Sequence, residues 1–177
     1  DPAAHRLVLD EVDPPTAVPG QLLVRVRAAG MNRADVFVVA GSYVVAGAPA
    51  ATRPFVAGGE LAGEVVAVGD GVAGWAPGDR AMAMGRGYAE LAAVEAALAW
   101  RVPDGMSWAA AGALPVGIAT MHDALVTNGR LEPGHHVVVT AASSGVGVVA
   151  VRLALAAGAS SVIGTSRAPA KRDELVA

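Results

Sequence analysis

HHVVVTAASSGVGVVAVRLALAAGASSVIGTSRAPAK, residues 135–171, is the stretch of sequence that decides the fold. Its β-branched run at residues 137–139 is typical of a buried parallel strand, and residues 142–147 are small enough for a tight turn. Residues 148–157 follow with the apolar pattern of a helix, which Gly158 ends. The apolar run at residues 161–165 predicts a second short strand. The stretch therefore predicts the strand, turn, helix and strand of an α/β fold.

The turn at residues 142–147 has the composition of a dinucleotide-binding turn. On the template Gly-x-Gly-x-x-Gly, its three glycine positions hold Ala142, Ser144 and Gly147. Backbone N–H groups at the start of the helix, together with the positive end of the helix dipole, would hold a pyrophosphate. Ser144 can approach it through its own N–H and add a hydroxyl donor. We therefore expect the whole turn to bind the cofactor: Ala142, Ser143, Ser144, Gly145, Val146 and Gly147. The alternative is a strand–helix turn of an α/β protein without a nucleotide.

The end of the second strand indicates which nucleotide is bound. An acidic residue there would bind the ribose 2′-hydroxyl of NAD, whereas basic residues suit the 2′-phosphate of NADP. The chain has no acidic residue there before Asp173. It offers hydroxyl and cationic groups instead, on Thr165, Ser166, Arg167 and Lys171. We therefore expect these residues to bind NADP(H), with a solvated basic start of a helix as the alternative.

The composition narrows the class of protein. The chain has 177 residues, of which 54% are hydrophobic and 16% charged, as in a globular protein. A net charge of -3 without a basic cluster argues against nucleic acid as a partner. The long apolar stretches are interrupted by Gly, Ser, Thr or Pro, which argues against a membrane span. The absence of cysteine excludes disulfides and thiolate metal sites, and it fits a cytoplasmic protein.

The first part of the chain, residues 1–105, is predicted to be all-β. Alternating apolar residues between turn signals predict five strands, at residues 22–28, 64–69, 80–84, 88–94 and 98–102. These strands would form a small barrel. Two helices are expected after them: one that Ser107 caps and Pro115 ends, and one over residues 117–126.

Several motifs, in the same order along the chain, resemble the medium-chain dehydrogenase/reductase superfamily. They are residues 26–35 (VRAAGMNRAD), 41–43 (GSY), 59–65 (GELAGEV), 77–80 (PGDR) and 87–90 (GYAE), followed by the turn at 142–147. Within the superfamily the chain is most similar to the zinc-free quinone oxidoreductases, with polyketide enoyl reductases as near relatives. The resemblance implies a GroES-like β-barrel domain over residues 1–116. The first part of a Rossmann NADP-binding domain would follow over residues 117–177, with NADPH in the cleft between the two.

The resemblance also implies that no metal takes part. Zinc alcohol dehydrogenases of this superfamily have a cysteine at the position of Asn32 and a histidine at the position of Gly59. Both ligands are absent here. Without a Lewis acid, hydrogen bonds would polarise the hydride acceptor, which suits quinones and conjugated enones.

The family's motifs assign candidate roles to single residues. Asn32 would donate an amide N–H to a substrate carbonyl, or else stabilise a turn. Tyr43 matches a tyrosine near the nicotinamide and is a candidate proton donor, or else packs on the barrel. Asp35 and Glu60 would organise the catalytic pocket, and we include Asp35 in the catalytic set. Thr120 matches a threonine that contacts the nicotinamide, or else it is a capping or packing hydroxyl.

The Rossmann part is expected to be incomplete. The residues from His135 to the end number 43, enough for one strand–helix–strand unit of about 30 residues. A complete dinucleotide fold has two larger halves. We therefore expect a portion of a longer, homodimeric enzyme, with a half-protein that pairs with another chain as the alternative.

The sequence thus predicts an NADPH-dependent, zinc-independent oxidoreductase that transfers hydride to a small-molecule quinone or conjugated enone. The alternatives are a catalytically weak, crystallin-like NADP-binding protein and an enoyl reductase of a polyketide-type system. A truncated half-domain that acts as an interaction module is a further alternative.

Overall fold

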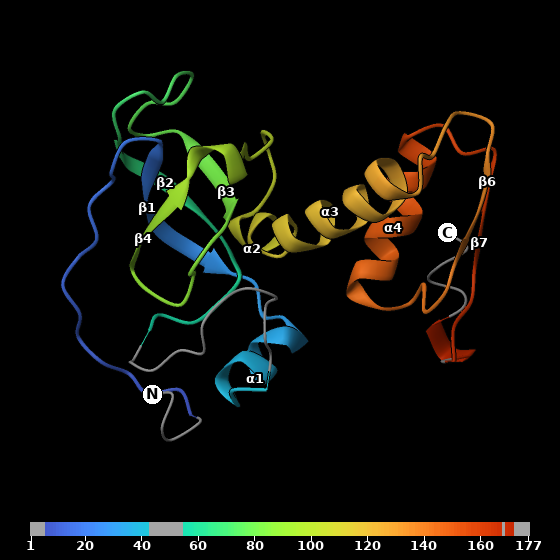
Figure 1. The fold of residues 1–177 in the computed structure, drawn as a ribbon, viewed down its shortest axis with the longest axis horizontal. Helices are drawn as coiled ribbons and strands as arrows, with labels where there is room; N and C mark the ends of the chain where they lie inside the picture. Colours follow the sequence, from blue (N-terminus) through green and yellow to red (C-terminus); the bar gives the residue numbers. More distant parts are fainter. Residues whose placement is uncertain (1–5, 43–54, 168, 172–177) are drawn as a thin grey trace. The chain divides into compact units, whose positions relative to one another are not determined.

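The computed structural model describes residues 6–42, 55–167 and 169–171. The chain divides into two compact units, Asp1–Pro115 and Val116–Ala177, which are described separately below (Figure 1).

The first unit is built on a five-stranded antiparallel sheet. Its strands are β1 (Gln21–Ala29), β2 (Glu60–Val68), β3 (Arg80–Met84), β4 (Leu91–Glu95) and β5 (Ala99–Arg101). They lie in the order β4-β1-β2-β3-β5. In β1 the buried residues Leu22 and Val24 alternate with half-buried or exposed ones, because successive side chains of a strand point to opposite faces.

Apolar side chains cover both faces of this sheet. Leu22, Val24, Leu61 and Val65 belong to the core on one face, and none of them is exposed. On the other face, Ala62 and Met82 pack with Ala111 of the short helix α2 (Trp108–Gly112). The sheet thus has a core on each side around β2 and β3, whose residues are buried in near-continuous runs, whereas an alternating sequence predicts one solvated face.

The order of the elements in this unit follows the prediction, but several bounds differ. Strand β2 begins at Glu60 rather than at residue 64, and β4 begins at Leu91 rather than at residue 88. The helix α1 (Arg33–Val39) was not predicted. Pro115 does not end the helix that Ser107 caps but begins the next one, α3 (Pro115–His122), where the missing N–H of proline costs nothing.

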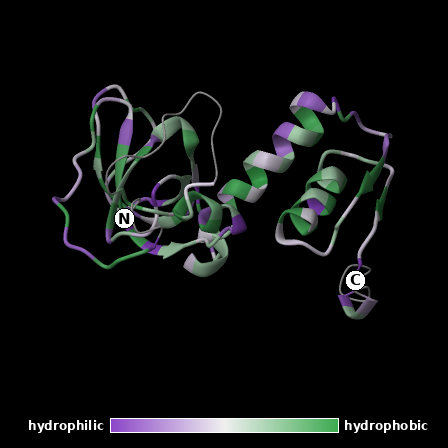
Figure 2. Cartoon of the chain, turned by 60° about the horizontal axis from the view of Figure 1, so that its bottom comes forward, coloured by the Kyte–Doolittle hydropathy of each residue, from purple (hydrophilic) through white to green (hydrophobic). Residues whose placement is uncertain are grey.

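The second unit contains a parallel strand–helix–strand motif. Strand β6 (His136–Val139) leads into α4 (Gly145–Ala156), which leads into β7 (Ser161–Gly164). The two strands pair in parallel, with Val139 opposite Gly164. Figure 2 shows mostly apolar residues along α4.

This motif has a small core of its own. Val139, Ala142 and Ala150 are buried, and Met121 of α3 and Leu125 pack against them. Leu125 belongs to a π-helical segment, Asp123–Asn128, that continues α3, whereas the sequence predicted one α-helix over residues 117–126. No helix in the described part of the chain is both long enough and apolar enough to span a bilayer.

Candidate functional site

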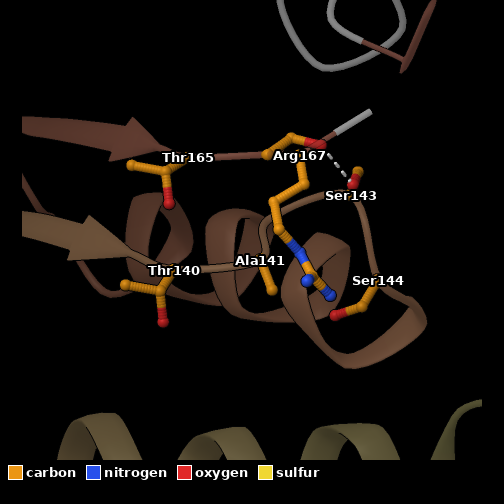
Figure 3. Close-up of a pocket in the computed structure, with 7 residues that line it drawn as sticks. Thr140, Ala141, Ser143, Ser144, Thr165 and Arg167 are labelled. Carbon is orange, nitrogen blue, oxygen red and sulfur yellow. Dashed lines mark hydrogen bonds between the residues drawn. The ribbon is translucent and has the colours of Figure 1, made fainter. Parts of the chain in front are cut away.

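A cavity of about 670 Å³ opens where β6 and β7 end and α4 begins (Figure 3). Seven residues line it: Thr140, Ala141, Ser143, Ser144, Thr165, Ser166 and Arg167. The carboxyl ends of parallel strands are where open α/β sheets bind their ligands. The cavity therefore lies at the place that the sequence indicated for a nucleotide.

Ser144 is the N-cap of α4, and it precedes backbone N–H groups that are available to an anion. Its hydroxyl oxygen accepts a hydrogen bond from the N–H of Gly147 at 3.1 Å, which is the geometry of an N-cap. The N–H groups of Gly145 and Val146, the first two residues of the helix, have no acceptor within the helix. These two groups, at the positive end of the helix dipole, can bind an anion.

The backbone of the turn differs from the expectation in one respect. The N–H of Ser144 donates to the carbonyl oxygen of Ala141 at 2.9 Å, so it closes the turn and does not point to a ligand. This turn requires a left-handed backbone at Ala141, whose φ is 53°. The hydroxyl proton of Ser144, in contrast, is not used by the N-cap bond and can be donated.

Gly147 is the glycine of the turn that the packing requires. A Cβ at this position would collide with the carbonyl oxygen of Ala141 and lie 2.8 Å from the Cα of Ala142. The absence of a side chain therefore lets α4 approach the turn after β6, which is the role of the third glycine in the dinucleotide template. A Cβ at Gly145 would meet nothing within 4 Å.

The polar groups after the two strands converge on the cavity. The hydroxyls of Ser143 and Ser166 lie 2.6 Å apart, and the side chain of Arg167 extends toward Ala141 and Ser144 (Figure 3). Arg167 is exposed and carries a permanent positive charge at the mouth of the cavity.

Six residues predicted to bind the cofactor are not among the described residues that line the cavity: Ala142, Gly145, Val146 and Gly147 of the turn, and Thr120 and Lys171 outside it. Lys171 is exposed at the end of the 3-10 turn Pro169–Lys171, and Thr120 is exposed on α3.

In the first unit, hydrogen bonds join four polar residues, which we call the Asn32 cluster: Asn32, Asp35, Glu60 and Tyr88. The side-chain amide nitrogen of Asn32 donates to Oε1 of Glu60 at 2.7 Å. Oδ2 of Asp35 accepts two hydrogen bonds, from the backbone N–H of Asn32 and from the hydroxyl of Tyr88, each at 2.8 Å. The bond between Asn32 and Asp35 spans the first turn of α1.

The Asn32 cluster is withdrawn from solvent. Glu60 is only 3% exposed, and Asn32, Asp35 and Tyr88 are half-buried. Burial raises the pKa of Tyr88 to about 12, and the hydrogen bond to Asp35 and the charges of Asp35 and Glu60 act in the same direction. The hydroxyl of Tyr88 is thus held as a neutral donor.

The cluster joins Asn32 and Asp35, two residues that the sequence singled out, with Glu60. It also contains Tyr88, to which the sequence assigned no role beyond its place in the motif at residues 87–90. No local pattern signals its contact with Asp35, because 53 positions separate the two. Tyr43, the other candidate of the catalytic set, lies outside the described residues.

Potential metal ligands do not gather in the described part of the chain. No group of three or more His, Cys, Asp or Glu side chains there could hold an ion. At the two positions where the resemblance places zinc ligands, the chain has an amide, on Asn32, and no side chain at all, at Gly59.

Curated proteins with similar sequences include a polyketide synthase and a synaptic vesicle membrane protein homolog. Residues 18–104 match the family described as the alcohol dehydrogenase GroES-like domain. The chain is 39% identical over 157 residues to the polyketide synthase GfsB of Streptomyces halstedii, covering 88% of this chain and 3% of that protein. It is 38% identical over 157 residues to the human synaptic vesicle membrane protein VAT-1 homolog, covering 88% of this chain and 39% of that protein.

Solved structures share the fold over nearly the whole chain. An alcohol dehydrogenase superfamily protein from Novosphingobium aromaticivorans superposes with a TM-score of 0.83 at 33% identity, over 96% of this chain and 52% of that one. The enoyl reductase CurK gives a TM-score of 0.83 at 27% identity, over 94% of this chain and 52% of that one. The quinone oxidoreductase of Thermus thermophilus, whose structures include a complex with NADPH, gives a TM-score of 0.79 at 31% identity. The match covers 97% of this chain and 53% of that one.

The chain thus spans about half the length of these solved structures. Its first unit contains a GroES-like domain, and a parallel strand–helix–strand motif with a cavity at the carboxyl ends of its strands follows in the second. The chain belongs to the medium-chain dehydrogenase/reductase superfamily.

Proposed function

We propose that the protein carrying this chain is an NADPH-dependent, zinc-independent oxidoreductase that reduces a quinone or a conjugated enone. The observation that carries the proposal is the cavity at the start of α4, which combines an anion-binding helix end with the guanidinium of Arg167. NADPH carries a pyrophosphate, which suits the helix end, and a 2′-phosphate, which suits the guanidinium.

The pyrophosphate would lie against the start of α4. There the N–H groups of Gly145 and Val146 and the hydroxyl of Ser144 offer three donors on neighbouring residues. The extra 2′-phosphate of NADP would lie near Ser166 and Arg167, which line the same cavity. Thr165 lines it too, and we propose Lys171 as a second cation for this phosphate.

The bound NADPH would supply the hydride, and the chain's own residues would bind and polarise the acceptor. We propose that the amide of Asn32 donates to the carbonyl of the substrate and that Thr120 contacts the nicotinamide. Zinc-independence rests on the donor set, because Asn32 and Gly59 replace the two side chains that would hold a catalytic zinc and the chain has no cysteine. Tyr43 remains our candidate for a proton donor.

An enoyl reductase is the second candidate. It is favoured by the 39% identity to the polyketide synthase GfsB and by the TM-score of 0.83 with the enoyl reductase CurK. Its substrate would be an α,β-unsaturated thioester, which is activated by conjugation in the same way as an enone.

We further propose that the nucleotide-binding domain begins at residue 117, that the full-length protein is a cytoplasmic homodimer and that its substrate is a small molecule. The proteins named above are similar to this chain over only part of their length, so these statements concern the whole protein that carries it.

Consumption of NADPH tests the function directly. The purified protein, treated with a chelator, should oxidise NADPH when a 1,4-quinone or a conjugated enone is added. Faster turnover with an enoyl thioester than with either acceptor would favour the second candidate. Binding of NADPH without turnover on any of the three would indicate a cofactor-binding protein, and absence of binding would indicate an interaction module.

A further inference from the structure

We propose that Glu60 is a positioning residue, whose buried carboxylate fixes the direction of the Asn32 amide at the catalytic site. The inference rests on the proposed function, in which Asn32 binds the acceptor. Asp35, which is hydrogen-bonded to Tyr88, would hold the backbone of Asn32 in place.

The direction of the amide follows from the chemistry of its partner. An ionised carboxylate only accepts hydrogen bonds, so it selects the nitrogen end of the Asn32 side chain, which lies 2.7 Å from Oε1 of Glu60. One N–H of Asn32 is thereby used. The second N–H and the carbonyl oxygen of the amide then have fixed positions, and the second N–H is the donor left for a substrate carbonyl.

Glu60 is itself held by the fold. It is the first residue of β2, paired with Met84 of β3, and it is 3% exposed. The buried Gly30 leaves room for its carboxyl group, because a Cβ at that position would collide with the Glu60 side chain. A carboxylate on a strand, enclosed in this way, is a more precise support than one on a loop.

The other half of the cluster fixes the backbone. Oδ2 of Asp35 accepts hydrogen bonds from the backbone N–H of Asn32 and from the hydroxyl of Tyr88. Tyr88 belongs to the segment that precedes β4. The loop that carries Asn32 is thus tied to α1 and to that segment. With two donors on one oxygen, Asp35 is suited to hold Asn32 in place rather than to exchange a proton with a substrate.

The variant Glu60→Gln tests whether Glu60 orients the Asn32 amide, because glutamine keeps the size and shape of the glutamate side chain. Glutamine can present either its oxygen or its nitrogen, so it no longer selects one orientation of Asn32. We expect kcat with the quinone to fall about 10- to 100-fold, as for misplacement of a catalytic group, with little change in KM for NADPH. Glu95→Gln is the matched control, because Glu95 accepts from the side-chain amide of Gln21 at the same 2.7 Å on an exposed surface. It should leave kcat unchanged.

A double-mutant cycle distinguishes an effect of Glu60 on the position of Asn32 from a general loss of activity or stability. In an Asn32→Ala background, Glu60→Gln should change kcat by less than about twofold, because the group it positions is gone. An effect of the same size in both backgrounds, or no effect of Glu60→Gln alone, would overturn the proposal. Tyr88→Phe provides a second variant, which removes one hydroxyl and should lower kcat in the same selective way.

An NMR measurement keeps the inference testable even if the protein reduces neither acceptor. The two side-chain amide protons of Asn32 should give well-separated resonances that exchange slowly, because one of them is bound to Glu60. Glu60→Gln should bring the two resonances together, while Glu95→Gln should not. Unchanged Asn32 resonances in Glu60→Gln would refute the positioning role, whereas a protein that lacks turnover but shows this shift would refute only the proposed function.

Discussion

The hydroxyl oxygens of Ser143 and Ser166 lie 2.6 Å apart, although 23 positions separate the two residues in the sequence. The bond joins the turn after β6 to the segment after β7, on the two sides of one cavity. It therefore links the start of α4, where we propose that the pyrophosphate binds, to the residues that would select NADP, next to Arg167.

Substitution of Ser144 separates its two roles. Ser144→Ala removes the N-cap of α4 and should lower the free energy of unfolding by about 1 kcal/mol. Ser144→Asp keeps an N-cap acceptor, so its stability should remain near that of the unmodified protein. The added negative charge should nevertheless weaken NADPH binding. Denaturant unfolding and NADPH titration measure the two effects, and equal NADPH affinity in Ser144→Asp would show that no phosphate lies at this helix end.

Gly147→Ala should destabilise the second unit by about 1–3 kcal/mol, because its Cβ would collide with backbone atoms of Ala141 and Ala142, which cannot turn aside as the end of a side chain can. Gly145→Ala is the matched control two residues earlier, in open space at the start of the same helix. It should be neutral or more stable by up to about 1 kcal/mol. Equal destabilisation of the two variants in thermal unfolding would contradict the packing described for α4.

The hydroxyl of Tyr88 should couple stability to alkaline pH. Its pKa is about 12 in the folded protein, compared with 10.0 for an ordinary tyrosine. The folded state thus favours the protonated form, and the stabilisation that this contributes is complete below pH 10 and is lost as the pH rises from about 10 to about 12. The difference in unfolding free energy between the unmodified protein and Tyr88→Phe should shrink over this range. A difference that stays constant up to pH 12 would show that the phenol is not held by the Asn32 cluster.

Asn32→Ala should reduce turnover more than cofactor affinity. Loss of a hydrogen bond to the developing oxyanion should lower kcat on the order of 100-fold, with little change in the Kd for NADPH. Asn128→Ala is the control, because the Asn128 amide bonds locally, to the backbone and side chain of Asp123. Steady-state kinetics with a quinone would contradict the assignment if both variants retained full turnover.

Local patterns were sufficient for the nucleotide motif. Residues 136–156 contain the strand, the turn and the helix in the predicted order, but α4 begins at Gly145, three residues earlier than predicted, because Ser144 caps it, a role that the sequence did not assign. The start of β2 was missed because Ala62 and Gly63 are poor strand formers on their own. The fold requires Gly63 there, since a Cβ would collide with the backbone of Arg25.

The Asn32 cluster could be predicted only in part. Asn32 and Asp35 are three positions apart and were recognised together, but Glu60 lies 28 positions from Asn32 and Tyr88 lies 53 from Asp35. Such contacts depend on the pairing of β1 with β2 and on the path of the chain before β4, which no short pattern records. Helix α1 was missed for a related reason, because none of its residues is buried and its three valines favour a strand.

The central claim, that this chain contributes a site for NADPH, is tested most directly by equilibrium titration of the protein with NADPH and with NADH. NADPH should bind more tightly, since charge-assisted bonds to the 2′-phosphate contribute roughly 1.5–3 kcal/mol each. The double variant Arg167→Ala/Lys171→Ala should lose this preference and bind NADH unchanged, while Arg152→Ala on the exposed side of α4 should bind both as before. An equal loss of affinity for NADPH and NADH in the double variant would contradict the account, and so would tighter binding of NADH than of NADPH by the unmodified protein.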